Sequence, residues 1–411
     1  MQHINKKCVV SFSIESNSVS KRQRQYESSH PWLTFQCNLA HVSSSVWMNL
    51  GAVQSKCRHV ANTLLPPPLL SELQKIYLAK GVMATTAIEG NSMSEAEVRA
   101  IIDGRANVAP LQDYQAQEVS NIVDACNAIV AQIAEGDDGS LSVEQIRDLN
   151  RRVLRNLPPR EGETPGEIPA FNVVVGRYRG APRGDCAWLL SKFCDWMNAR
   201  EWQGTAANRL ALGVIRAVLA HLYFAWIYPF GDGNGRTARL LEFKILLAAG
   251  APLPAAHLLS SHYNQTRAEY YRQLDAASRS GGRIFPFLEY AIQGLVDGLD
   301  RQIEYINSHQ WRATWKEYVF AEFGPDVSAV ARRQRQVALD LWDCGPDGVP
   351  ASKIQTLTPE IAVHYARRDA QAVARDLKVL EKMGLIERHH QVIAVKFHTL
   401  LEQRKPWAAT E

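Results

Sequence analysis

Glycines and charged side chains alternate in the segment Tyr228–Arg239, which reads YPFGDGNGRTAR. Gly231, Gly233 and Gly235 allow the backbone to turn back on itself, so that successive N–H groups point into one concavity. We expect a helix to begin at Thr237, and its dipole places positive charge at the same concavity. Such a cluster of N–H groups suits phosphate oxygens. The segment therefore predicts an anion-binding loop.

The charged residues of this loop add one possible metal ligand and two arginines that can donate hydrogen bonds to an anion. Asp232 offers the hard oxygen that Mg²⁺ prefers, and Mg²⁺ in proteins usually accompanies a polyphosphate. Arg236 and Arg239 are three residues apart, so they share one helix face and can grip further phosphate charge as forks. The alternative is a glycine-rich turn with surface arginines. Because Asp232 and Asn234 accompany the glycines and arginines, the anion site is favoured.

The loop resembles the Fic motif, H-P-F-x-D/E-G-N-G-R-x-x-R, at every defined position except the first. The similarity extends from about Pro31 to the C-terminus. Fic proteins bind the phosphates of ATP with Mg²⁺ and transfer AMP to a hydroxyl of a target protein. The resemblance implies a mainly α fold, in which a Fic-type helical bundle with a small β-hairpin flap precedes a winged-helix domain.

The resemblance also implies a role for each residue of the loop. Asp232 would coordinate Mg²⁺, Arg239 would contact the γ-phosphate, and Phe230 would anchor the loop in the core. The residues expected to bind the ATP phosphates are Gly233, Asn234, Gly235, Arg236 and Arg239.

Tyr228 is the departure from the motif, because the family has its catalytic His at this position. That His accepts the proton of the target hydroxyl. A phenol with a reference pKa of about 10 donates a proton rather than accepting one at neutral pH, so Tyr228 should be a poor base. His221 lies two helical turns upstream, about 10 Å away, and we interpret it as a packing residue. His257 and His262 could reach the site only through tertiary approach.

Thr85–Asn91 resembles the inhibitory motif of Fic proteins, Ser/Thr-x-x-x-Glu-Gly-Asn, in the form that precedes the loop. A pair between Glu89 and Arg239 would occupy the cation expected to hold the γ-phosphate. Glu89 and Asn91 are therefore predicted to be inhibitory. The alternative is a plain helix C-terminus with a Gly-Asn stop. In some relatives the same Glu positions a water that removes AMP, which keeps a hydrolytic role open.

A β-branched segment, Asn172–Tyr178, predicts a short hairpin and resembles the Fic flap. The residues expected to dock a target segment as an added strand are Asn172, Val173, Val174 and Val175. Just before it, Pro169 stands where the family pattern Gly-Glu-x-Arg has Arg. Two departures near one site indicate a degenerate enzyme.

Aromatic and amide side chains further along resemble the adenine-side residues of the family, and such groups suit a purine. They are Tyr263, Asn264, Tyr270 and Tyr271, and core packing is the alternative reading for the tyrosines.

Periodicity and capping signals predict the elements that position these residues. The expected helices are 44–62, 69–88, one opened by the capping box Ser94–Glu97, 112–134, one opened by Ser142 and Gln145, 188–199, 208–226, 237–249 and 263–278. The predicted divisions are a disordered arm at 1–28, a helical region with the inhibitory helix at 29–135, the Fic core at 136–300, a linker helix at 301–327 and a winged-helix domain at 328–400.

The last region predicts three helices, 332–342, 359–365 and 370–383, and a two-strand ribbon, 385–388 and 392–397. This is the order of a winged helix. Residues 332–398 carry eleven Lys or Arg and eight Asp or Glu, and Asp369, Asp376 and Glu381 dilute the charge of the third helix. The residues expected to approach DNA are Arg367, Arg368, Arg375, Lys378, Lys382, Arg388, His389 and His390. The alternative is a docking or dimerisation module.

The composition of the 411 residues is typical of a soluble protein with several folded units, with 46% hydrophobic residues and a net charge of +4. The seven cysteines are scattered without CxxC or zinc spacing, and neither an export signal nor a membrane span is expected. We therefore expect a cytoplasmic protein with reduced thiols. Its expected function is ATP–Mg²⁺ binding in the protein adenylyltransferase class, impaired by Tyr228. Alternatively, it is a nucleotide-responsive DNA-binding regulator. A homodimer is a further candidate assembly.

Overall fold

The computed structural model describes residues 24–105, 113–159, 161–326, 328–366, 368 and 370–397. The chain divides into two compact units between Ile303 and Glu304. Most of the predicted disordered arm lies outside the described residues, as do Arg367 and Asp369. The last residues of that arm correct the prediction, because Tyr26–Ser29 form a short helix and the Tyr26 N–H donates to Asp185 at 2.9 Å.

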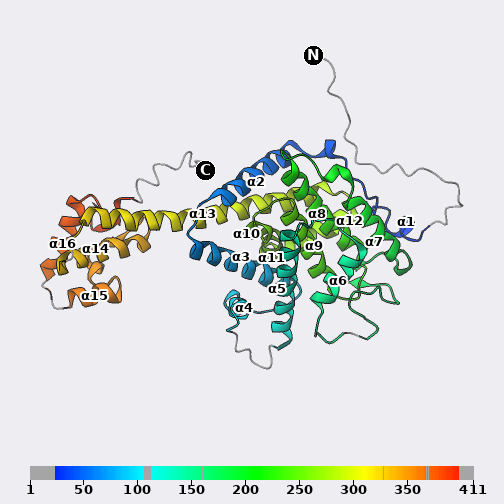
Figure 1. The fold of residues 1–411 in the computed structure, drawn as a ribbon, viewed down its shortest axis with the longest axis horizontal. Helices are drawn as coiled ribbons and strands as arrows, with labels where there is room; N and C mark the ends of the chain where they lie inside the picture. The colour runs from blue at the N-terminus through cyan, green and yellow to red at the C-terminus, as the bar shows by residue number, and fades with distance from the viewer. Residues whose placement is uncertain are drawn as a thin grey trace, which may run out of the picture. The chain divides into compact units, whose positions relative to one another are not determined.

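The first unit is helical apart from one hairpin (Figure 1). Its helices are α1 (Tyr26–Ser29), α2 (Ser44–Asn62), α3 (Pro67–Ile88), α4 (Glu95–Ile102), α5 (Asp113–Ala134), α6 (Val143–Val153), α7 (Arg183–Met197), α8 (Arg209–Ile227), α9 (Asn234–Ala248), α10 (Leu253–Ala256), α11 (Leu258–Gln265), α12 (Arg267–Arg279) and the first part of α13 (Phe285–Phe323). Short 3-10 helices occur at Leu39–His41 and Arg200–Trp202. The hairpin pairs β1 (Val174–Val175) with β2 (Tyr178–Arg179).

The core of this unit forms around α8, which packs against α9, α7 and α2, while α9 also contacts α3, α5 and α6 (Figure 1). The reason is the sequence of α8, which is apolar apart from Arg209, Arg216 and His221, so that most of its surface must be covered. By length and composition α8 could cross a membrane, contrary to the expectation that no segment could, but 83% of its apolar window is buried within the domain. Its end and the start of α9 carry the glycine-rich loop.

The structure confirms some of the helix ends predicted from capping residues and periodicity, and corrects others. Ser94 and Ser142 both form the predicted capping boxes. The predicted helix 263–278 is wrong as one element, because it breaks at Thr266 between α11 and α12. The Thr266 hydroxyl donates to the His262 carbonyl at 2.8 Å, a local bond that competes with helix continuation. Helix α9 starts at Asn234 rather than Thr237, directly after Gly233 at a φ of 75°.

The second unit combines helices with a small antiparallel sheet. Its elements are the last part of α13, α14 (Ala329–Asp340), α15 (Pro359–Tyr365), α16 (Ala370–Lys382), β3 (Val349–Pro350), β4 (Ile386–His389) and β5 (Val392–Val395), with 3-10 helices at Leu341–Cys344 and Ala351–Thr356. The sheet order is β3-β5-β4. The predicted two-strand ribbon is present, because β4 pairs antiparallel with β5. The sequence missed a third strand, since Val349 pairs with Ile393.

Asp376 on α16 is the polar centre of this second unit. Its carboxylate accepts hydrogen bonds from Arg333 Nε at 2.6 Å, Gln334 Nε2 at 2.8 Å and the Tyr365 hydroxyl at 2.8 Å. Burial raises the pKa of Asp376, but these donors outweigh burial and hold that pKa below its ordinary 3.8. Asp376 therefore links the helices inside the unit. The sequence analysis expected it to dilute the surface charge of α16, and that expectation is wrong.

Replacing Asp376 with Ala should lower the free energy of unfolding of the second unit by about 3–5 kcal/mol, because Arg333 would stay buried without its partner. Urea unfolding of the full chain measures this change. The matched control is Asp343→Ala, whose exposed pair with Arg312 should contribute about 1 kcal/mol or less. The Asp376 contribution should be present above pH 3.8 and be lost as pH falls through its lowered pKa. Equal effects of the two substitutions would contradict this assignment.

Candidate functional site

A cavity of about 400 Å³ opens beside the glycine-rich loop, within the first unit. Five elements contribute to its wall, namely the end of α3, the hairpin, the end of α8, the start of α9 and α12. The side chains that matter below are Glu89, Tyr178, His221, Tyr228, Arg239, Tyr270 and Tyr271, and Gly235 contributes backbone. Tyr228, Gly235 and Arg239 of the loop therefore share one cavity with the predicted gate Glu89.

Two backbone positions and one side chain give the loop its shape. Tyr228 ends α8 in the left-handed region at a φ of 48°, and Gly233 adopts the same region. The Asn234 side chain accepts from the Phe230 N–H at 3.0 Å and donates to the Phe230 carbonyl at 2.6 Å. Asn234 was expected to bind phosphate, but its side chain is buried and holds the loop closed through these two hydrogen bonds. Only the backbone N–H of Asn234 is left at the start of α9.

Asn150 on α6 is a further support of the loop that sequence reasoning missed. Its buried amide donates to the Asp232 carbonyl at 2.9 Å and to the Thr237 hydroxyl at 3.3 Å. Its oxygen accepts the Gly166 N–H at 2.8 Å, in the turn that leads to Pro169. One asparagine thus ties the loop to the segment before the hairpin. No local motif around Asn150 marks this role.

The predicted contact between Glu89 and Arg239 is present. Arg239 is 3% exposed and donates from Nη2 to Glu89 Oε1 at 2.6 Å, and from Nε to the Thr85 hydroxyl at 2.6 Å. Burial lowers the pKa of Arg239, but Glu89 and nearby groups outweigh it and leave that pKa above its ordinary value. A Cβ placed on Gly235 would lie 2.2 Å from Glu89 Oε1. The carboxylate therefore rests on the loop backbone as well as on Arg239.

Arg236 does not face the cavity, in contrast to the sequence expectation. It is 3% exposed and donates to Glu118 Oε1 on α5 at 2.6 Å and to Asp232 Oδ1 at 3.3 Å. Asn91, predicted to be inhibitory, donates to Glu118 Oε2 at 3.0 Å and contacts neither arginine directly. Burial raises the pKa of Glu118, although Arg236 opposes this. Glu118 was not predicted, since an isolated Glu on a helix carries no sequence signal.

Tyr228 is half-buried at the cavity wall. Burial raises the pKa of its phenol well above the ordinary 10.0, and the carboxylates of Glu89 and Asp232 raise it further. The phenol therefore keeps its proton at any pH below 10.0 and cannot serve as a base there. The sequence expectation of a poor base rested on the reference pKa alone, and the surroundings strengthen it.

The three histidines considered as replacements for the missing catalytic His all pack within the domain. His221 is buried, with Nε2 at 2.9 Å from the Tyr270 hydroxyl and Nδ1 at 3.4 Å from Glu242. His257 stacks on Phe243, and burial lowers its pKa to about 3. His262 packs against Tyr290. Of the three, only His221 is among the described residues that line the cavity. Its Nε2 is engaged with Tyr270, while its buried Nδ1 has no hydrogen-bond partner among the described residues.

The predicted adenine-side residues separate into two pairs. Tyr270 and Tyr271 line the cavity, and the Tyr271 hydroxyl donates to the Ile88 carbonyl at 3.2 Å. Tyr263 does not reach the cavity, because it is fully buried behind Tyr270 with ring centroids 4.8 Å apart. Asn264 does not line the cavity either. Instead, α12 presents Leu274, Asp275 and Ser278, which follow the two tyrosines at helical spacing.

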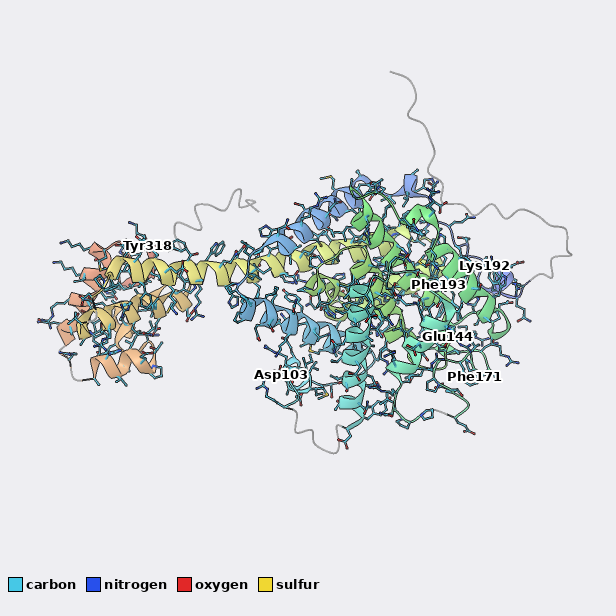
Figure 2. All side chains as sticks on the ribbon, in the orientation of Figure 1. Asp103, Glu144, Phe171, Lys192, Phe193 and Tyr318 are labelled. Atoms are coloured by element: carbon cyan, nitrogen blue, oxygen red, sulfur yellow. The ribbon has the colours of Figure 1, made fainter. Side chains whose placement is uncertain are left out.

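The hairpin stands at the cavity rim and is anchored to the end of α8. The Tyr178 hydroxyl donates to the Trp226 carbonyl at 2.6 Å, and the Ala181 N–H donates to the Ile227 carbonyl. Val174 and Val175 are exposed, as expected of a docking strand, while Val173 is buried. Asn172 accepts the Arg183 N–H at 2.9 Å and so caps α7. Phe171, just before the hairpin, also lies at the surface (Figure 2).

Comparisons with known proteins identify the domain that carries the glycine-rich loop. Residues 140–246, from before α6 through most of α9, match the Fic/DOC family. Protein adenylyltransferase fic-1 from Caenorhabditis elegans is 31% identical over 226 residues, which are 54% of this chain and 40% of that relative. The chain thus spans about two fifths of the length of this curated relative.

Solved structures extend the likeness. A structure of Fic-1 from Caenorhabditis elegans is 26% identical, with a TM-score of 0.54, over 64% of this chain and 73% of that chain. A Fic family protein from Desulfovibrio desulfuricans has a TM-score of 0.53 over 86% of this chain and 96% of its own. At 18% identity the latter supports the fold alone. The chain is therefore a distant homologue of protein adenylyltransferases.

Proposed function

From the Fic/DOC-family domain at residues 140–246, we propose that this chain binds ATP with Mg²⁺ at the loop Tyr228–Arg239 and belongs to the AMP-transferring class. We further propose that Glu89 gates the site and that Tyr228 impairs the transfer. The observation that carries the proposal is the Glu89 carboxylate, an anion seated on Arg239 and against Gly235. A phosphate oxygen would make the same two contacts once Glu89 leaves.

The donor set of the loop fits a metal–phosphate ligand. Arg236 Nε is buried without an acceptor in the described part of the chain. Asp232 Oδ1 accepts from Gly233 and Arg236, while Oδ2 accepts no hydrogen bond from the described residues. A hard carboxylate oxygen with this freedom suits Mg²⁺. When bound, Mg²⁺ would neutralise charge on the phosphates.

AMP transfer needs a base for the attacking hydroxyl. The oxygen of a target hydroxyl bonds to the α-phosphorus of ATP, pyrophosphate leaves, and the hydroxyl proton must pass to an acceptor. Tyr228 occupies the position expected of that acceptor and keeps its own proton. The exposed Val174 and Val175 would hold the target segment as an added strand. The proposal therefore assigns nucleotide binding and target docking to this site, and an impaired proton transfer to Tyr228.

Replacing Glu89 with Gln should strengthen ATP binding about tenfold or more, because the charge that competes for Arg239 is removed. Isothermal titration calorimetry with ATP and Mg²⁺ measures the change. The matched control is Glu72→Gln, since Glu72 is also on α3 but pairs with Arg99 at the surface. An unchanged affinity in Glu89→Gln would contradict the gate.

Adding Tyr228→His to Glu89→Gln should raise AMP transfer by about 10²–10⁴-fold, the usual contribution of a positioned base. Histidine tolerates the left-handed backbone at this position. Mass spectrometry after incubation with ATP and Mg²⁺ detects the added AMP. Tyr228→Phe in the same background removes the hydroxyl without supplying a base, and should show no gain. Transfer by Glu89→Gln alone at the level of the double variant would refute the role given to Tyr228.

A second candidate function, DNA binding, is favoured by one observation in the second unit. Asp376 points into the core, so it does not offset the exposed Arg375, Lys378 and Lys382 of α16. We propose that this unit works as a winged helix, with α16 facing the DNA and the exposed turn between β4 and β5 beside it. Its charge would then let a nucleotide-responsive domain act on DNA.

The double variant Arg375→Ala/Lys378→Ala should weaken DNA binding and reduce the slope of log affinity against log salt by about two, one for each lost phosphate contact. Fluorescence anisotropy with duplex DNA at several salt concentrations measures both. Arg312→Ala, which removes a cation paired with Asp343, serves as the control. An unaltered salt slope in the double variant would exclude α16 as the contact surface.

A further inference from the structure

Both terminal nitrogens of the Arg236 guanidinium are held by carboxylates. Nη1 donates to Glu118 Oε1 at 2.6 Å, and Nη2 donates to Asp232 Oδ1 at 3.3 Å. Arg236 is 3% exposed and does not line the cavity. Its orientation is therefore set by α5 on one side and by its own loop on the other. This places Arg236 between a helix carboxylate and the carboxylate proposed to bind Mg²⁺.

Glu118 is itself fixed from its far side. It is 7% exposed, and its second oxygen accepts from Asn91 Nδ2 at 3.0 Å. The same Asn91 amide donates to the Gln115 carbonyl at 3.0 Å, one turn earlier on α5. A buried carboxylate is costly unless it is paired and hydrogen-bonded, and Glu118 pairs with Arg236 and accepts a hydrogen bond at each oxygen. These contacts fix the orientation of Glu118 between Asn91 and Arg236.

The sharing of one guanidinium by two carboxylates has an electrostatic consequence for Asp232. While Glu118 holds Arg236, the longer contact to Asp232 leaves that carboxylate only partly neutralised. Without the Glu118 charge, Arg236 would pair with Asp232 alone and compete with any cation for its oxygens. Glu118 thus favours the state of Asp232 that a metal ion needs.

We propose that Glu118 is a positioning residue of the nucleotide site, holding Arg236 so that Asp232 remains free to bind Mg²⁺. The inference rests on the proposed function of the loop. It gives Arg236 a supporting role for the metal ligand. Partners of metal ligands typically change metal affinity about 10–100-fold when they are removed.

The test measures the magnesium enhancement, defined as the Kd for ATP in EDTA divided by the Kd for ATP in saturating Mg²⁺. Glu89→Gln is the reference, because the gate would obscure binding in the unmodified chain. Adding Glu118→Gln should lower the enhancement about tenfold and leave the Kd in EDTA nearly unchanged. Asp124→Asn is the control, since Asp124 also lies on α5 but pairs with Arg155 at the surface.

A double-mutant cycle separates positioning from general damage. If Glu118 acts through Arg236, then Glu118→Gln should have no further effect on the enhancement once Arg236→Gln is present. Additive effects, or equal losses of affinity with and without Mg²⁺, would overturn the inference. If Glu118→Gln fails to fold, Glu118→Asp keeps the charge on a shorter side chain. It should lower the enhancement partially, and an unchanged enhancement would overturn the inference.

The two proposals fail in distinguishable ways. Absence of ATP binding by Glu89→Gln at every Mg²⁺ concentration overturns the nucleotide site and this inference with it. Binding that depends on Mg²⁺, with an enhancement that Glu118→Gln does not move, overturns only the role of Glu118.

Discussion

Two arginine side chains buried at the start of α9 impose the main constraint on the first unit. A guanidinium that is 3% exposed must have an anionic partner, because an unpaired buried charge is strongly destabilising. Arg239 finds Glu89 at the end of α3, and Arg236 finds Glu118 on α5. These pairs fix where both helices meet α9. A bound polyphosphate would need the same positive charges. The two arginines would therefore contribute both to the stability of the ligand-free fold and to the affinity for a ligand.

The rest of the loop is built to keep those groups in place. Asn234 closes the turn onto Phe230, and Asn150 joins it to α6 and to Gly166. A loop held by such internal bonds would lose little freedom on binding an anion. Tyr228 fits the same framework as a side chain at the end of α8, yet its burial keeps it protonated. An internally hydrogen-bonded loop therefore adjoins a group unsuited to accept a proton.

Sequence reasoning found the residues that lie in compact motifs, and missed those that reach the site across the fold. The Glu89–Arg239 contact was predicted because each residue sits at a defined motif position. Arg236 and Glu118 are 118 positions apart in the sequence, and Asn150 and Asp232 are 82 positions apart. No local sequence pattern marks either contact. Tyr263 lies buried against Tyr270, outside the cavity lining, and no local pattern distinguishes it from the two tyrosines that do line the cavity. The third strand at Val349 is too short to show a period of two.

The turn after α3 has a reciprocal relation with the ligand. Its Glu89 contacts Arg239 directly, and its Asn91 contacts Arg236 through Glu118. Any ligand that displaces Glu89 also removes a restraint on this turn, which is closed by the bonds from the Gly90 N–H to Ala87 and from the Asn91 N–H to Thr86. By thermodynamic linkage, if such a ligand favours opening of the turn by some factor, then opening of the turn increases the affinity for that ligand by the same factor. A partner protein that grips the end of α3 would thus act as an effector without entering the cavity.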